Sequence, residues 1–79
     1  MEKVTKFEMS VVGSDGFESR IYSRGLYAPS KKFDEECMKY APEVRKDVVY
    51  FFLKRTSTSS RLSVTLADGT IVEAKTWEE

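Results

Sequence analysis

Few side chains of this sequence could carry out catalysis. Histidine is absent and Cys37 is the only cysteine, which removes the commonest general base and the Cys/His ligand sets of zinc sites. Cys37 falls on an apolar helical stripe, where free cysteines are usually buried and inert. Asp34, Glu35 and Glu36 are consecutive helix positions that point in different directions, so their carboxylates do not converge. The sequence therefore predicts no enzyme activity, no cofactor and no metal site.

Two loop segments have the composition of phosphate-binding sites. Gly13-Ser14-Asp15-Gly16 is rich in glycine, but it matches neither a P-loop nor a dinucleotide fingerprint and it joins two strand-like segments. The second segment, Thr56 to Ser60, consists of Ser and Thr and is flanked by cations. Such residues favour turns through local hydrogen bonds. We interpret both segments as solvated connections.

Binding residues are easier to find than catalytic ones. In the last strand-like segment, alternation places four side chains on one side, beside Thr65 of the preceding segment. Tryptophan is enriched at the centres of protein interfaces, and an isoleucine lies nearby. These residues form the predicted protein-binding surface: Thr65, Ile71, Glu73, Lys75 and Trp77.

A second set of residues supports a different function. Cations and a tyrosine alternate along residues 17–24, and further cations flank the Ser/Thr segment. On one sheet face they would resemble the aromatic and basic surfaces that bind single-stranded nucleic acid. The alternative set is Arg20, Tyr22, Arg24, Lys54, Arg55 and Arg61. Thirteen basic and thirteen acidic residues cancel, which argues against a strong uniform positive field.

The chain from Arg61 to Trp77 predicts a hairpin whose turn decides which residues face the core. A two-residue turn at Asp68-Gly69 would mix charges into the apolar side. A three-residue loop with Gly69 in the left-handed conformation, as in a G1 bulge, shifts the pairing by one residue. That register collects the apolar residues on one face, with these opposite pairs: Leu66 and Thr70, Val64 and Val72, Leu62 and Ala74.

The same turn chemistry recurs near the N-terminus. Residues 5–12 and 17–24 both alternate in polarity and are separated by a segment that ends in Asp15-Gly16. A three-residue loop with Gly16 in the bulge predicts these opposite pairs: Phe7 and Ser23, Met9 and Ile21, Val11 and Ser19. Agreement between the two hairpins is the main support for both.

The middle of the chain contains one predicted helix. Ser30 is the expected N-cap, residues 31–40 carry an apolar stripe, and Asp34 to Glu36 are placed in the early turns near the positive end of the dipole. Pro42 prevents a smooth continuation. Residues 48–53 either extend the helix beyond a kink or form a strand. Their β-branched and aromatic composition favours the strand.

These elements predict one small α+β domain over residues 1–79. We expect the order β-β-α-β-β-β, an antiparallel sheet of five strands with a helix on one face; the fallback is β-β-α-β-β with a longer, kinked helix. The single cysteine, the absence of an apolar run of about 20 residues and the N-terminus MEKVTKFE favour a cytoplasmic protein without membrane contact. Edge-strand pairing into a homodimer remains open.

The predicted function is a non-catalytic protein-binding module, a small inhibitor or regulator that acts by steric occlusion. The alternative is a single-stranded nucleic-acid-binding protein. The small size, the missing catalytic groups and the self-contained sheet resemble small phage-encoded proteins that bind and inhibit a host factor. This resemblance is one of general style, and no motif carries it.

Overall fold

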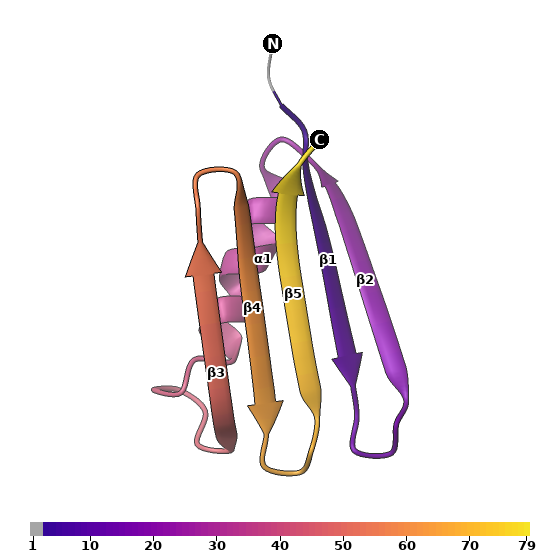
Figure 1. Cartoon of the computed structure of the whole chain (residues 1–79), viewed down its shortest axis with the longest axis vertical. Helices are drawn as coiled ribbons and strands as arrows, with labels where there is room; N and C mark the ends of the chain where they lie inside the picture. Colours follow the sequence, from indigo (N-terminus) through magenta and orange to yellow (C-terminus); the bar gives the residue numbers. More distant parts are fainter. Residues whose placement is uncertain (1–2) are drawn as a thin grey trace.

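The computed structural model describes residues 3–79 as one antiparallel sheet with a single helix against one face (Figure 1). The elements follow the predicted β-β-α-β-β-β order, which confirms the fold class. The strand order across the sheet is β2-β1-β5-β4-β3. The bounds are β1 (Thr5–Val12), β2 (Glu18–Gly25), α1 (Ala28–Lys39), β3 (Val48–Arg55), β4 (Ser59–Leu66) and β5 (Ile71–Glu78). No helix in the described chain has the length and apolarity needed to cross a membrane.

Both Asp-Gly hairpins have the predicted register. Gly16 and Gly69 are the only described residues with positive φ, at 86° and 94°, and glycine reaches this region without steric cost. Val64 pairs with Val72 and Met9 with Ile21. The predicted bulged turns are therefore confirmed.

The aspartates stabilise the same turns by a second route. Asp15 Oδ1 accepts a hydrogen bond from the N–H of Phe17 at 3.0 Å, and Asp68 Oδ1 accepts one from the N–H of Thr70 at 2.9 Å. The bond from Thr70 also lowers the pKa of Asp68. Aspartate followed by glycine thus supplies both the local acceptor and the left-handed residue that the turn requires.

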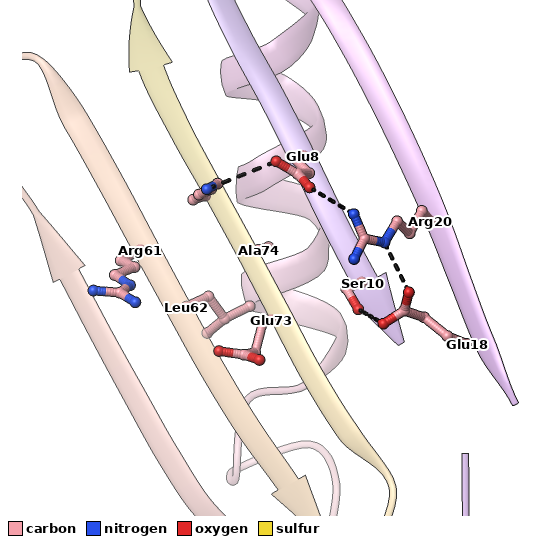
Figure 2. Close-up of a pocket in the computed structure, with 9 residues that line it drawn as sticks. Glu8, Ser10, Glu18, Arg20, Arg61, Leu62, Glu73 and Ala74 are labelled. Atoms are coloured by element: carbon pink, nitrogen blue, oxygen red, sulfur yellow. Dashed lines mark hydrogen bonds and ion pairs between the residues drawn. The ribbon is translucent and has the colours of Figure 1, made fainter. Parts of the chain in front are cut away.

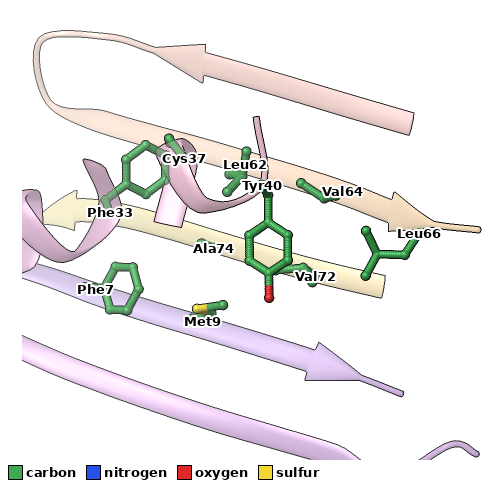
Figure 3. Close-up of a cluster of buried hydrophobic side chains, with 10 residues drawn as sticks. All are labelled: Phe7, Met9, Phe33, Cys37, Tyr40, Leu62, Val64, Leu66, Val72 and Ala74. Carbon is green, nitrogen blue, oxygen red and sulfur yellow. The ribbon is translucent and has the colours of Figure 1, made fainter. Parts of the chain in front are cut away.

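The core lies between the helix and the sheet (Figure 3). Helix α1 contributes Phe33 and Cys37, and Tyr40 at its end joins them. Strands β1, β4 and β5 contribute every second residue, as a pleated sheet requires. The buried apolar set is Phe7, Met9, Phe33, Cys37, Tyr40, Leu62, Val64, Leu66, Val72 and Ala74.

The predicted start of the helix was wrong. Helix α1 begins at Ala28 after Tyr27, and no side chain caps its N-terminus. Pro29 lies in the first turn, where its fixed φ suits a helix and its missing N–H costs nothing. Ser30 is consequently inside the helix, and the acidic residues from Asp34 onward lie beyond the first turn, where the dipole has little effect on them.

The ambiguous segment after Pro42 is a strand. Residues 48–53 belong to β3, so the predicted strand is confirmed and the longer helix is not formed. Val48 and Phe51 pack against the core, and this packing stabilises the extended conformation of the segment. The register of β3 against β4 shifts between Val48 and Tyr50, and Val49 is therefore the extra residue of a β-bulge.

Candidate functional site

The sheet face opposite α1 carries no other element of the described chain, and we call it the open face. In Figure 1 the helix lies behind the sheet, so this face points toward the viewer. Its side chains alternate with the buried ones along each strand. By strand they are Glu18, Arg20, Tyr22 and Arg24 of β2; Lys6, Glu8, Ser10 and Val12 of β1; Ile71, Glu73, Lys75 and Trp77 of β5; Ser59, Arg61, Ser63 and Thr65 of β4; Tyr50, Phe52 and Lys54 of β3.

The five residues predicted to bind a protein share this face. Thr65 lies opposite Ile71, which is 43% exposed, and Glu73 and Lys75 follow along β5. Trp77 is half-buried on β5, the central strand. The Nζ of Lys75 is 5.2 Å from the centre of the Trp77 ring, within cation–π range. The predicted juxtaposition is confirmed, while a binding role for it stays a prediction.

Two aromatic residues that the sequence analysis did not select extend this surface. Tyr50 and Phe52 of β3 pair with Thr65 and Ser63 of β4 and are 52% and 41% exposed. Val12 lies opposite Ile71 on the other side of β5. The result is an apolar corner of the open face, formed by Val12, Ile71, Thr65, Tyr50 and Phe52. Alternation within VVYFFL indicated that every second side chain of this run shares a face. Only the pairing of β3 with β4 shows that Tyr50 and Phe52 are the ones on the open face.

Three cations form a row next to this corner. Lys54 pairs with Arg61, and Arg61 pairs with Lys75. Within residues 3–79, Lys54 and Arg61 have no ion pair, and Lys75 reaches only Glu8, at 3.7 Å. A shallow groove beside this basic row extends from Lys54 to Trp77. Two of the three cations, Lys54 and Arg61, therefore offer positive charge that no ion pair of the described chain neutralises, and Lys75 is partly neutralised by Glu8.

The β1–β2 side of the open face is neutralised, in contrast. Figure 2 shows Arg20 between Glu18, at 2.8 Å, and Glu8, at 3.6 Å. Glu79 accepts hydrogen bonds from Arg24 at 3.1 and 2.9 Å and lies 3.2 Å from Lys6. These two cations lower the pKa of Glu79 to about 2. The ion pairs cancel most of the charge on this side.

The residues of the nucleic-acid alternative do not form one cluster. Arg20, Tyr22 and Arg24 lie on edge strand β2, whereas Lys54 and Arg61 are separated from them by β1 and β5. The alternative required all six residues to share one face, and Arg55 does not meet this condition. Arg55 alternates with Lys54, so it points to the helix side, where it pairs with Asp34 at 2.6 Å.

The side chains considered for catalysis and phosphate binding are occupied by structural contacts. Cys37 is buried, as predicted, and burial raises the pKa of its thiol even though Arg55 opposes the shift. Thr56 Oγ1 accepts the N–H of Ser59 at 3.0 Å within the β3–β4 turn. Among residues 3–79, no three His, Cys, Asp or Glu residues are grouped so that they could hold a metal ion.

The open face combines three features: an apolar corner, a basic row that is only partly neutralised and a half-buried tryptophan. Comparisons with protein-family models, curated proteins and solved structures gave no significant match. The groups of the open face offer apolar contact, positive charge and hydrogen bonds to a surface laid against it.

Proposed function

We propose that this protein is a non-catalytic protein-binding module whose open face docks on an acidic protein surface. The observation that supports this proposal is the uncovered apolar corner beside the basic row. Exposed apolar patches rimmed by polar residues mark interaction sites. Ile71 on β5 and Tyr50 and Phe52 on β3 are each more than 40% exposed.

The size of the face indicates what kind of interface it can form. Five strands about 4.8 Å apart and eight residues long give a flat area of roughly 500 Å² before side-chain relief is counted. A standard interface buries about 800 Å² on each partner. Stable binding would therefore bury most of the open face. The partner would lose access to the part of its own surface that the open face covers. Inhibition or regulation by steric occlusion follows from such a contact.

Charge complementarity defines the chemistry of the partner. Carboxylates opposite Lys54, Arg61 and Lys75 would replace the solvent that now screens these cations, while an apolar side chain would fill the corner at Ile71. Complementary charges mainly increase the association rate and the specificity, and the buried apolar anchors supply most of the affinity.

A single-stranded nucleic acid is the second candidate, and one observation favours it: the basic row runs beside the Trp77 ring, on which a base could stack. Three acidic residues on the same face oppose it, namely Glu8, Glu18 and Glu73. The net charge of the chain is also zero. We therefore favour a protein partner.

Affinity capture from a cognate lysate tests the proposal with three matched variants. Ile71→Glu and Arg61→Glu change the apolar corner and the basic row, and Met38→Glu changes a 71% exposed apolar residue on helix α1. We expect a protein that binds the wild type and Met38→Glu but not the other two, with unchanged circular dichroism. Recovery of nucleic acid that is lost after nuclease treatment, with no protein, would overturn the proposal.

A further inference from the structure

The two edges of the sheet differ in how they are protected against pairing with other strands. Edge strand β2 carries Glu18, Arg20 and Arg24, and charged residues are a common protection of sheet edges. Edge strand β3 contains the uninterrupted apolar run VVYFFL. Four of these side chains are exposed by 39 to 66%: Val49, Tyr50, Phe52 and Leu53. A long, exposed, apolar edge of this kind favours strand pairing.

The backbone of β3 has free hydrogen-bonding groups at known positions. The N–H of Thr56 donates to the carbonyl of Ser59 at 2.8 Å, so Thr56 is a hydrogen-bonded position of the β3–β4 ladder. Such positions alternate along an antiparallel pair. Arg55, Leu53 and Phe51 therefore direct their N–H and C=O groups away from β4, toward the outside of the sheet.

We propose that a second copy of this chain pairs with β3, antiparallel, about a twofold axis at Phe52. Phe52 then lies opposite Phe52 of the second copy on the open face, and Tyr50 lies opposite Lys54. On the helix side, Phe51 lies opposite Leu53. Every outward N–H and C=O of Phe51 and Leu53 finds a partner, and the pairing joins the two sheets into one of ten strands.

Neighbouring registers are less favourable. An axis at Phe51 brings the bulge at Val49 opposite Leu53 and interrupts the ladder. An axis at Leu53 places Arg55 opposite Phe51, although Arg55 is held by Asp34. The axis at Phe52 gives three consecutive apolar rungs on the regular part of β3 and keeps the bulge outside them. Of the three registers, it alone also places Tyr50 opposite Lys54 of the other copy at both ends, where a cation–π contact can form.

The free part of the edge also agrees with this register. In Figure 1 the connection from α1 reaches the sheet at the end where β3 begins, and the β-bulge at Val49 lies at the same end. Tyr50 to Arg55 remain as the accessible ladder. Because the twofold axis uses both β3 edges and leaves only the charged β2 edges outside, the assembly closes at two copies.

The dimer goes beyond the proposed binding function and does not depend on it. If both hold, the two open faces become continuous and the apolar corners meet at the axis. A partner strand from another protein could occupy the same edge by β-augmentation. The self-complementary register is our reason for choosing a second copy as the occupant.

Molecular mass in solution is the first test. The wild type should have twice the mass of one chain by light scattering or sedimentation, over a concentration series. Leu53→Pro removes an outward N–H without breaking the β3–β4 ladder, and proline is tolerated on edge strands in this orientation. It should give a monomer, whereas Tyr22→Pro on the β2 edge should remain dimeric. A wild type that is monomeric throughout, or a dimer that survives Leu53→Pro with folded spectra, would overturn the proposal.

Disulfide cross-linking tests the register independently of whether the proline variant folds. In a Cys37→Ser background, Phe52→Cys places two thiols directly opposite at a non-hydrogen-bonded rung, where Cα atoms are about 4.5 Å apart and within disulfide range. Phe51→Cys, Leu53→Cys and Ile21→Cys, the last on the β2 edge, should cross-link at least tenfold more slowly. Equal rates at all four positions would show random collision and contradict the twofold axis at Phe52. Pairing of β3 with a strand of another protein, and never with a second copy of this chain, would contradict it too.

Discussion

Val64 lies directly opposite Val72 across β4 and β5, and neither side chain is exposed to solvent. This pair determines the composition of both faces of the sheet. Because side chains alternate, burying Val64 and Val72 directs Thr65, Ile71 and Glu73 to the open face. A slip of one residue would exchange the faces, and the basic row would be buried.

The turn at Gly69 maintains this register, so a side chain there should destabilise the fold. Gly69→Ala places a Cβ at a φ of 94° with no heavy atom within 4 Å, and the cost is therefore conformational strain alone. We expect the free energy of unfolding to fall by about 1–2 kcal/mol, measured by urea denaturation.

Gly25→Ala is the matched control for the turn. A Cβ at Gly25 meets only Pro29 Cδ at 3.8 Å, an ordinary contact, and the backbone there has no positive φ. This variant should change the free energy of unfolding by less than about 0.5 kcal/mol. Equal losses in the two variants would contradict the role assigned to the left-handed conformation.

Leu62 should be one of the most sensitive core positions. It is 1% exposed and pairs with Ala74, so Leu62→Ala leaves a cavity beneath the helix. Such truncations cost about 2–5 kcal/mol, a large part of the roughly 5 kcal/mol expected for a small domain. Thermal unfolding should move markedly downward, while Val44→Ala at a 73% exposed loop position should leave it unchanged. A midpoint of thermal unfolding that Leu62→Ala leaves unchanged would contradict the burial of Leu62 in the core.

The sequence was sufficient for the parts of the fold that depend on local rules. Alternation of polarity and Asp-Gly turns predicted both hairpins with their registers, because a three-residue bulged loop is the only choice that keeps Val64 and Val72 together. The strand at residues 48–53 followed from β-branched and aromatic composition. In each case, local preference and burial favour the same structure.

The sequence was insufficient where long-range packing decides. The helix begins before Ser30, and Pro29 in its first turn is fully buried; burial of this kind depends on tertiary packing, which capping preference alone does not show. Whether Lys54 or Arg55 lies on the open face could not be decided, because the phase of β3 relative to β4 was unknown. The same phase places Tyr50 and Phe52 on the open face and Phe51 on the helix side. This part of the candidate site could therefore be found only in the three-dimensional structure.

Glu79 should link acid stability to the packing of the chain end against β1 and β2. Its pKa is lowered to about 2, first by hydrogen bonds from Arg24 and then by Lys6. Because the pKa in the folded state is below that of the unfolded chain, the stabilisation is present above about pH 4.5 and is lost as the pH falls toward about 2. Carboxyl titration by NMR measures this pKa directly.

Arg24→Ala tests the cause of that shift. Removing the guanidinium should raise the pKa of Glu79 toward its ordinary value, with the remaining shift due to Lys6. Arg45→Ala removes a cation that pairs with Asp47 instead, so it should leave the Glu79 titration unchanged. A Glu79 pKa that stays low without Arg24 would contradict the ion pair.

Arg61 should control the salt dependence of partner binding, because it is the middle residue of the basic row. Arg61→Ala should weaken binding by about tenfold at low ionic strength, or about 1.4 kcal/mol. At about 0.5 M salt the screening length falls below about 5 Å, so the difference between wild type and variant should shrink to about twofold. Titration calorimetry of the captured partner at both salt concentrations measures this.

Lys46→Ala is the control for that titration, since Lys46 is an exposed cation on the connection between α1 and β3. It should bind like the wild type at both salt concentrations. Equal losses of affinity for the two variants would show that binding depends only on the net charge of the chain and that the basic row does not contact the partner. A loss for Arg61→Ala that persists undiminished at high salt would instead indicate a contact through its aliphatic stem, because packing is not screened by ions.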